Sequence, residues 1–302
     1  MSTSSGSSQS SDSTPASLAV PTAAPARRMS TRNRFLFFLV AWLIVLMPFL
    51  FWWNTWFGRR LSDKELTEYL NDQKHPRHIQ HALVQLSVRM RGDAQAAQWY
   101  PQLVILAASP VEEIRNTDAW VMGQDTSGAG FHEALLKMLG DSSALVRGNA
   151  ALSLVRFGDA SGRPQILELL QPVGVVAPAS GTIADASSVG TPVHQGGLVA
   201  KIKLDQEQAG SQNIEVRSPI SGRVRSLSSR TGAHVVAGSE LASVDPGDDQ
   251  VWEALRALYL VGRPEDLPVV HLYERDSPQI SDRVRQQAAL TEKSIVARTS
   301  QQ

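Results

Sequence analysis

The sequence predicts a multidomain chain with a single transmembrane helix, an α-solenoid of helix pairs, and an all-β domain inserted into the solenoid. Three observations predict this arrangement. Residues 35–57 carry no charge, helix-ending Gly residues recur at regular spacing within residues 62–170, and residues 173–247 change to short β-branched runs rich in Gly and Pro. A length of 302 residues is long for one domain and allows two or three.

The composition excludes several classes of chemistry. Lys and Arg total 29 and Asp and Glu total 29, so the formal net charge is zero and no basic stripe is available for a nucleic acid. The chain has no Cys, which excludes disulfides, Cys-ligated zinc, iron–sulfur clusters and Cys nucleophiles. We therefore predict no nucleic-acid partner and no chemistry that depends on thiols.

Two segments precede the solenoid. Residues 1–33 consist mainly of Ser, Thr, Ala and Pro and are predicted to be disordered, because they bury too little apolar surface to offset the entropy of ordering. Residues 34–57 are predicted to form a transmembrane helix, since the uncharged run over 35–57 would extend ~34 Å as a helix and a hydrocarbon core is ~30 Å thick. Trp52, Trp53 and Trp56 cluster at one end, where indole rings favour the interface.

A cleaved signal peptide is the alternative for this apolar segment. The run is too long for one, and no small-residue cleavage site follows it. Four basic residues precede the helix and three follow it: Arg27, Arg28, Arg32 and Arg34, then Arg59, Arg60 and Lys64. This small excess favours an amino terminus in the cytoplasm, which would make the soluble part extracytoplasmic, or periplasmic in a bacterium with two membranes.

Residues 62–170 show the pattern of a helical solenoid. Helical runs end at Gly92, Gly123 and Gly158, which are 31 and 35 positions apart. Regular spacing of this kind is typical of stacked helix pairs. Each pair has one apolar face that it cannot bury alone, so neighbouring pairs are expected to share a continuous core.

The clearest repeat unit begins at Asp141 and ends at Gly158. Its characteristic residues are Val146, Arg147, Ala150 and Ala151. This unit resembles the second helix of HEAT repeats, and the resemblance implies that the acid caps the helix, that Ala lets helices approach closely, and that the Arg ties neighbouring repeats together. Arg115 and Arg285 follow the same pattern, whereas Trp252 stands where the family would have Arg, which puts that tie in question.

Residues 173–247 contain an internal duplication. A Pro-x-x-Gly turn recurs 41 positions later, and a Gly-x-x-Val-x-x-Gly unit recurs 42 positions later. The four key glycines are Gly181 and Gly222 in the first pattern and Gly196 and Gly238 in the second. Two copies that are each too small to be stable alone predict interlocked hairpins with a shared core. The glycines are expected to supply the positive φ of tight turns.

These two patterns together resemble the barrel-sandwich hybrid of biotinyl and lipoyl carrier domains and of membrane-fusion (periplasmic adaptor) proteins. Carrier domains present a modified Lys in a tight hairpin, usually between Met residues, so the resemblance makes Lys201 and Lys203 the candidate acceptors. The segment from Lys201 to Ile214 has no Met and contains a polar loop, and it leaves no room for the helical hairpin of the adaptors. We therefore expect no cofactor, and we interpret this domain as a binding or spacing module.

The helical pattern resumes over residues 248–298. Residues 162–170 are typical of the first helix of a pair whose second helix is missing, and residues 251–262 match that missing helix. We infer that the β domain is inserted within a helical hairpin, which is tolerated when the ends of the insertion lie close together.

The sequence contains no catalytic constellation. His75, His78 and His81 stand three positions apart and are loosely compatible with a metal site, but no carboxylate has ligand spacing to them, so we predict exposed or partly packed imidazoles and no metal. A phosphate-binding loop and a Gly-x-Ser-x-Gly nucleophile elbow are both absent. These observations favour a protein that is not an enzyme.

The leading functional hypothesis is a membrane-anchored, non-catalytic scaffold or adaptor that binds protein partners, with an export or cell-envelope assembly as its setting. The membrane contact is assigned to residues 35–57. One alternative is a biotinyl or lipoyl carrier subunit that uses Lys201 or Lys203. A second is a lyase-like protein, because some HEAT-type proteins attach bilin pigments; this alternative rests on family analogy alone.

Overall fold

The computed structural model describes residues 31–54, 60–205 and 213–300. The chain divides into two compact units, Met1–Arg60 and Leu61–Gln302, which are described separately. Most of the tail predicted to be disordered, together with Trp56 and most of the loop predicted before Ile214, lies outside the described residues.

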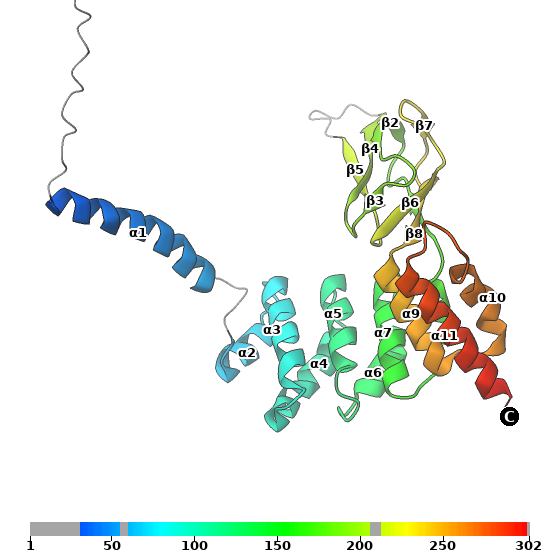
Figure 1. Ribbon diagram of the computed structural model, residues 1–302, viewed down its shortest axis with the longest axis horizontal. Helices are drawn as coiled ribbons and strands as arrows, with labels where there is room; N and C mark the ends of the chain where they lie inside the picture. The colour runs from blue at the N-terminus through cyan, green and yellow to red at the C-terminus, as the bar shows by residue number, and fades with distance from the viewer. Residues whose placement is uncertain (1–30, 55–59, 206–212, 301–302) are drawn as a thin grey trace, which may run out of the picture. The chain divides into compact units, whose positions relative to one another are not determined.

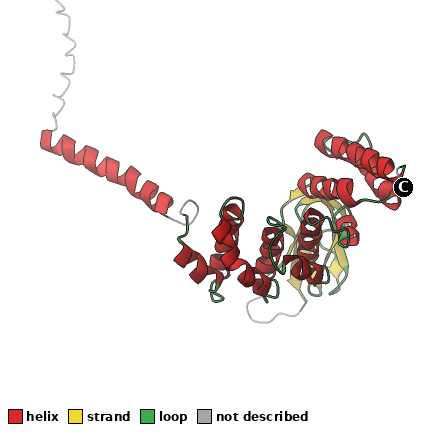
Figure 2. Ribbon diagram, turned by 90° about the horizontal axis from the view of Figure 1, so that it is seen from below, coloured by secondary structure: helices red, strands yellow, loops and turns green. Residues whose placement is uncertain are grey.

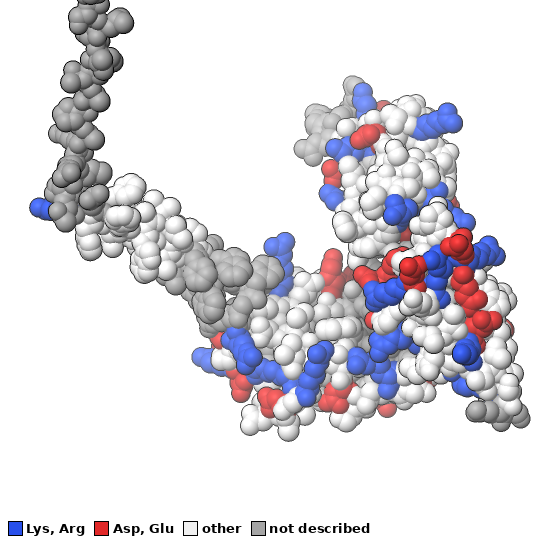
Figure 3. All heavy atoms as spheres, viewed as in Figure 1, with Lys and Arg blue, Asp and Glu red and all other residues white. Residues whose placement is uncertain are grey.

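The described part of the first unit is helix α1 (Thr31–Asn54), which has Pro48 in its interior. Its described side chains are mainly apolar and exposed, and its drawn atoms are almost all uncharged in Figure 3. Of the helices in the described part of the chain, none combines the length and apolar character needed to cross a membrane. The predicted span over residues 34–57 therefore remains a prediction, and residues 55–57 lie outside the described residues.

The second unit contains ten α-helices in its described residues, and they pack in consecutive pairs (Figure 1). They are α2 (Asp63–Leu70), α3 (Pro76–Arg89), α4 (Tyr100–Leu106), α5 (Glu112–Met122), α6 (Phe131–Met138), α7 (Ala144–Arg156), α8 (Arg163–Glu168), α9 (Asp248–Val261), α10 (Leu267–Val270) and α11 (Asp282–Thr299). In each pair the even-numbered helix packs on the odd-numbered helix that follows it, and α3, α5, α7, α9 and α11 pack on one another in that order. This confirms the prediction of a helical repeat-like region.

The repeated aliphatic position of the second helices lies in the core. Ile114, Val146, Val251 and Val284 are all buried. They belong to two apolar clusters, one formed by residues from Leu61 to Leu154 and the other by residues on both sides of the β segment. Each helix pair therefore buries its apolar face against its neighbours, as expected for stacked pairs.

The β segment forms two small antiparallel sheets, drawn in yellow in Figure 2. Its strands are β1 (Val173–Val176), β2 (Gly181–Ala186), β3 (Pro192–Val193), β4 (Leu198–Leu204), β5 (Ile214–Arg217), β6 (Gly222–Leu227), β7 (His234–Val235) and β8 (Glu240–Pro246). The strand orders are β1-β8-β6-β3 and β5-β4-β2-β7. Each sheet thus mixes strands from both copies of the duplication, and one core contains apolar residues of both copies.

The duplicated glycines serve two different purposes. Gly196 and Gly238 have φ of +73° and +84°, as expected for tight turns. The same expectation is wrong for Gly181 and Gly222, which do not have positive φ. A Cβ at Gly222 would lie 1.8 Å from the carbonyl oxygen of Asp245, so this glycine is required because the neighbouring strand approaches too closely for a side chain.

The β segment lies in the chain between α8 and α9, and these two helices pack on each other. The side-chain amide of Gln250 donates to the Leu169 carbonyl at 2.9 Å. The phenolic hydroxyl of Tyr273 donates to the Leu170 carbonyl at 2.6 Å, and burial raises the pKa of Tyr273 to about 12. The helical core therefore continues directly from one side of the β segment to the other.

The two helical parts are also joined by a nearly buried ion pair. Arg163 Nε lies 2.8 Å from Asp266 Oδ2, and Asp266 is 1% exposed. The hydrogen bond from Arg163 to Asp266 raises the pKa of Arg163. The two residues are 103 positions apart, so this contact closes a loop that contains the whole β segment.

One ionisable side chain of the helical core is buried with no compensation. Asp118, on α5, is fully buried, and neither of its carboxylate oxygens has a hydrogen-bond partner among the described residues. Burial raises the pKa of Asp118 well above its ordinary value, because desolvation disfavours the charged form. At a pH between its unfolded-state and folded-state pKa values, Asp118 is therefore protonated in the folded chain and ionised in the unfolded chain.

We expect Gly222→Ala to destabilise the chain by about 3 kcal/mol or more, because the strand must move to admit the methyl group. Gly238→Ala is the matched variant: no atom lies within 4 Å of its added Cβ, so only the positive φ opposes it, at a cost of about 1 kcal/mol. Thermal unfolding followed by circular dichroism measures both changes. Equal losses would show that close approach does not constrain Gly222.

We expect Asp118→Asn to stabilise the chain at neutral pH by about 1 kcal/mol or more. Because the folded-state pKa is raised, the wild-type stability falls as the pH rises above about 4 and levels off only above the folded-state pKa. The neutral amide removes this contribution. Unfolding midpoints of both proteins between pH 5 and pH 8 test the prediction, which fails if the difference between them does not grow with pH.

Candidate functional site

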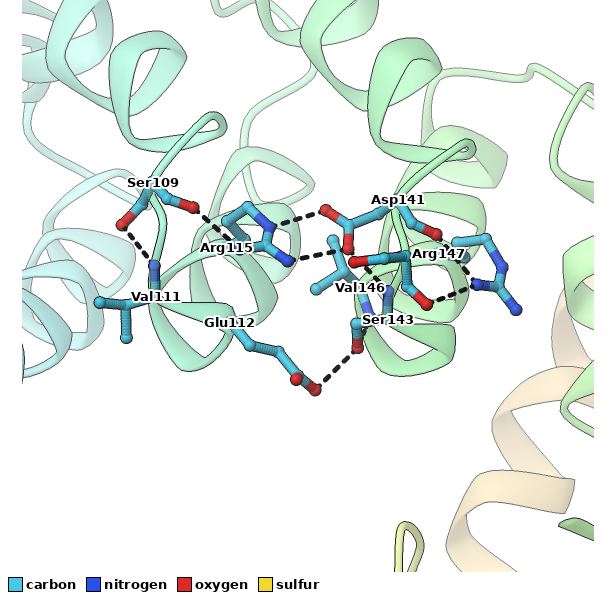
Figure 4. Close-up of polar contacts among 9 residues, drawn as sticks. Ser109, Val111, Glu112, Arg115, Asp141, Ser143, Val146 and Arg147 are labelled. Atoms are coloured by element: carbon cyan, nitrogen blue, oxygen red, sulfur yellow. Dashed lines mark hydrogen bonds and ion pairs between the residues drawn. The ribbon is translucent and has the colours of Figure 1, made fainter. Parts of the chain in front are cut away.

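Successive helix pairs are joined by an Arg115–Asp141 contact, shown in Figure 4. Arg115 on α5 donates from Nε to Asp141 Oδ2 at 2.7 Å and from Nη2 to Oδ1 at 2.9 Å, and its Nη1 donates to the Ser109 carbonyl at 2.8 Å. Both side chains are mostly buried, at 14% and 11% exposure. The bidentate bond lowers the pKa of Asp141 and raises that of Arg115, so the pair stays charged and holds α5 to the loop before α7.

The role implied for Asp141 by the HEAT resemblance is wrong, because this acid does not cap α7. The cap is Ser143, whose hydroxyl oxygen accepts from the Val146 amide at 3.4 Å. The same hydroxyl donates to Glu112 Oε1 at 2.8 Å, which adds a second contact to α5 (Figure 4). Asp141 is occupied by Arg115 and by the Ser143 amide, which donates to its Oδ1 at 2.8 Å.

Arg147 repeats part of this arrangement one unit later. Its Nη1 donates to the Asp141 carbonyl at 2.9 Å, the same six-residue reach as the bond from Arg115 to Ser109. Its Nη2 lies 3.2 Å from Glu168 Oε2 on α8. Arg115 and Arg147 therefore both join neighbouring helix pairs, as the resemblance implies.

Arg285 departs from this expectation. It pairs with Asp276, at 2.8 Å, and with Asp282, both of which lie in the same helix pair as Arg285, so no tie to a neighbouring pair results. The neighbouring pair is reached through Trp252 instead. The guanidinium carbon of Arg283 lies 4.2 Å from the Trp252 ring centroid, and Arg283 Nη1 lies 2.8 Å from Asp249 Oδ1.

Small polar side chains form further ties that were missed in the sequence. The Ser153 hydroxyl on α7 donates to the Ala119 carbonyl on α5 at 2.8 Å. Thr291 holds the equivalent place, seven positions after the buried valine of α11, and donates to the Leu255 carbonyl at 2.9 Å. The polar residue at this position of α7 and α11 was the available signal, whereas α5 and α9 carry Val121 and Leu258 there. The predicted small residues Ala150 and Ala151 are fully buried, consistent with close helix packing.

A groove with a volume of about 280 Å³ crosses the second helices of three successive pairs. Its lining includes Trp120 on α5, Arg156 on α7, and Arg256 and Leu260 on α9. Trp120 is 40% exposed and Leu260 is 56% exposed. Arg156 forms no ion pair with a described residue, and Arg256 is paired only at 3.4 Å, with Glu253. The groove therefore combines accessible apolar surface with positive charge.

The candidate acceptor lysines do not lie in a hairpin turn. Lys201 and Lys203 are both within β4, where Lys201 faces Asp185 on β2 and Glu215 on β5. Lys201 is half-buried and Lys203 is exposed. The predicted polar loop begins only after β4, and residues 206–212 lie outside the described residues.

An acidic side chain lies beside two of the three clustered histidines. Asp72, which had been overlooked as a ligand, folds back onto His75 and His78 and lies within hydrogen-bond distance of both. The expectation that no carboxylate has ligand spacing to these histidines is therefore wrong. His81 lies farther along α3, and burial lowers the pKa of its imidazole.

No protein-family model and no curated protein matches the chain. An engineered protein from the Northeast Structural Genomics Consortium aligns at 16% identity with a TM-score of 0.38 over 78% of this chain and 80% of that chain. The product-bound ectoine utilization protein EutE (DoeB) from Ruegeria pomeroyi aligns at 19% identity and a TM-score of 0.22 over 35% of each chain. A single-chain, multi-domain long-chain acyl-CoA carboxylase aligns at 13% identity and a TM-score of 0.22 over 51% of this chain and 16% of that chain. Below a TM-score of 0.5, none of these likenesses identifies a fold or a function.

We expect Arg115→Met to destabilise the chain by about 2 kcal/mol or more, because it leaves the mostly buried Asp141 carboxylate without its bidentate partner. Arg285→Met is the matched control: its acidic partners are largely exposed, so its loss should cost less than about 1 kcal/mol. Thermal unfolding midpoints compare the two. A larger effect at Arg285 would contradict the assignment of the tie to Arg115.

Proposed function

We propose that this protein is a membrane-anchored, non-catalytic scaffold whose helical region binds a segment of a partner protein. The observation that carries the proposal is the groove across α5, α7 and α9. Because it spans three helix pairs, it can hold an extended or helical segment, which is how stacked helical repeats offer binding surface.

The chemistry of the groove favours a partner segment that carries acidic and apolar side chains. Arg156 and Arg256 offer guanidinium groups that bind carboxylates well. Trp120 and Leu260 offer apolar surface on either side, and a large aromatic side chain is the type of residue that anchors protein interfaces. Glu253 is the one acidic residue in the lining, so the groove favours acidic over basic segments.

In this proposal the helical region is of the HEAT type and the β segment is a barrel-sandwich hybrid that acts as a second docking element. The six-residue reach shared by Arg115 and Arg147 supports the first assignment. The second is supported by the pairing of β1 with β8 and of β5 with β4, in which each copy of the duplication completes the sheet of the other.

The proposed anchor is the segment over residues 35–57, with the amino terminus in the cytoplasm and the part of the chain after residue 57 on the extracytoplasmic side. The support is the uncharged sequence of this segment and the exposure of its described apolar side chains. A tethered adaptor of this design suits an export or cell-envelope assembly.

The test is a pull-down of the full-length chain from detergent-solubilised membranes of its own cells. Leu260→Glu places a negative charge in the groove and is expected to reduce recovery of the partner at least tenfold. Val88→Glu is the matched control, because Val88 is 65% exposed on α3 and does not line the groove, and it should leave recovery unchanged.

A photo-reactive residue at position 260 should crosslink the partner within an acidic segment that contains apolar residues. Equal recovery by the two variants, or a basic crosslinked segment, would contradict the assigned groove. Release of the chain into the soluble fraction by an alkaline wash would contradict the tether.

A further inference from the structure

Three potential metal ligands converge at the corner between α2 and α3. Asp72 Oδ2 lies 2.8 Å from His75 Nδ1 and 2.7 Å from His78 Nδ1, and Asp72 Oδ1 lies 3.1 Å from His75 Nδ1. One potential ligand atom from each residue lies within 4.8 Å of the other two. Neither the scaffold function nor the groove uses this cluster.

The local backbone holds these side chains together. Helix α2 ends at Leu70, and the turn that follows is closed by a 3.1 Å hydrogen bond from the His75 amide to the Asp72 carbonyl. Pro76 starts α3, which places His78 in the first turn of that helix. The Tyr69 ring stacks on the His78 imidazole at 4.4 Å with an interplanar angle of 9°, which fixes the plane of this imidazole.

The set of donors is one that transition metals use. Two imidazoles and a carboxylate suit Zn²⁺ and related divalent ions, with bonds of about 2.0–2.2 Å and solvent free to complete the coordination. Adjacent ligands of a tetrahedral ion are about 3.3 Å apart, slightly more than the distances from Asp72 to the two imidazoles. His75 is 63% exposed, which leaves an entry path for an ion.

We propose that Asp72, His75 and His78 form a binding site for a divalent transition-metal ion, with Zn²⁺ as the bound ion. Each residue supplies one atom, and water completes the shell. In the ion's absence each imidazole Nδ1–H donates to the carboxylate; when the ion binds, the proton of each neutral imidazole lies on Nε2 and Nδ1 becomes a ligand. The ion links the end of α2 to the start of α3.

A second cluster supplies an internal comparison. His271, Glu274 and Glu292 also converge, with His271 Nε2 2.9 Å from Glu292 Oε1. This set has one imidazole in place of two, and burial raises the pKa of Glu274, which disfavours the charged carboxylate that a metal needs. The structure therefore favours the cluster at Asp72.

The experiment titrates the full-length chain in detergent with Zn²⁺, and with Co²⁺ as an optical probe. One equivalent of Zn²⁺ is expected to bind, and Co²⁺ should give visible absorption bands of nitrogen and oxygen ligation. His75→Gln and His78→Gln should each weaken Zn²⁺ binding at least tenfold. His132→Gln is the matched control, because His132 pairs with Asp159 at 2.7 Å and belongs to no three-residue cluster among the described residues.

Circular dichroism of each variant verifies that it is folded, and the largely exposed His75 is the position least expected to disturb the helices. Three outcomes overturn the proposal: no stoichiometric binding by the wild-type chain, unchanged binding by the His75→Gln/His78→Gln variant, or binding that is lost on His271→Gln and kept in the His75 and His78 variants.

Discussion

The ion pair between Arg163 and Asp266 is the contact on which the continuity of the helical region depends. Burial of a carboxylate that is 1% exposed is destabilising unless the group is paired and hydrogen-bonded, and Asp266 accepts both from the Arg163 side chain and from the Arg263 amide at 2.8 Å. These groups meet only if the chain returns to α8 after the whole β segment. The ion pair therefore requires the two ends of that segment to lie close together.

The duplication within the β segment provides this return. Its first strand, β1, pairs antiparallel with its last strand, β8, and Val173 faces Val244 in the register. An antiparallel pair places the start of one strand beside the end of the other, so the segment enters and leaves at one place. The helical core consequently continues from Ile166 and Leu170 to Val251 with little disturbance. The interlocking of the two copies therefore gives the β segment a shared core and brings its two ends together.

Patterns that repeat along the chain could be predicted from the sequence, whereas contacts that depend on the meeting of distant segments could not. The recurring position of Val146 and the glycine duplication report local geometry and were interpreted correctly as helix pairs and interlocked hairpins. The turn glycine Gly238 follows from its motif, but the need for glycine at Gly222 arises from Asp245 on another strand. Arg285 fits the motif of Arg115, yet the acids within its reach belong to its own helix pair. Asp72 was overlooked because a turn, and not helical spacing, brings it to the histidines.

The ties between second helices have a consequence for the candidate groove. Ser153 and Thr291 bond to the preceding second helix at equivalent places, and Asn149 adds a 2.7 Å bond to Asn116, so side chains as well as packing hold α7 to α5 and α11 to α9. The α5 and α7 walls of the groove, which are held together in this way, lose little conformational entropy when a segment binds. The contacts that stabilise the repeats therefore also preorganise the surface that the proposed scaffold offers to its partner.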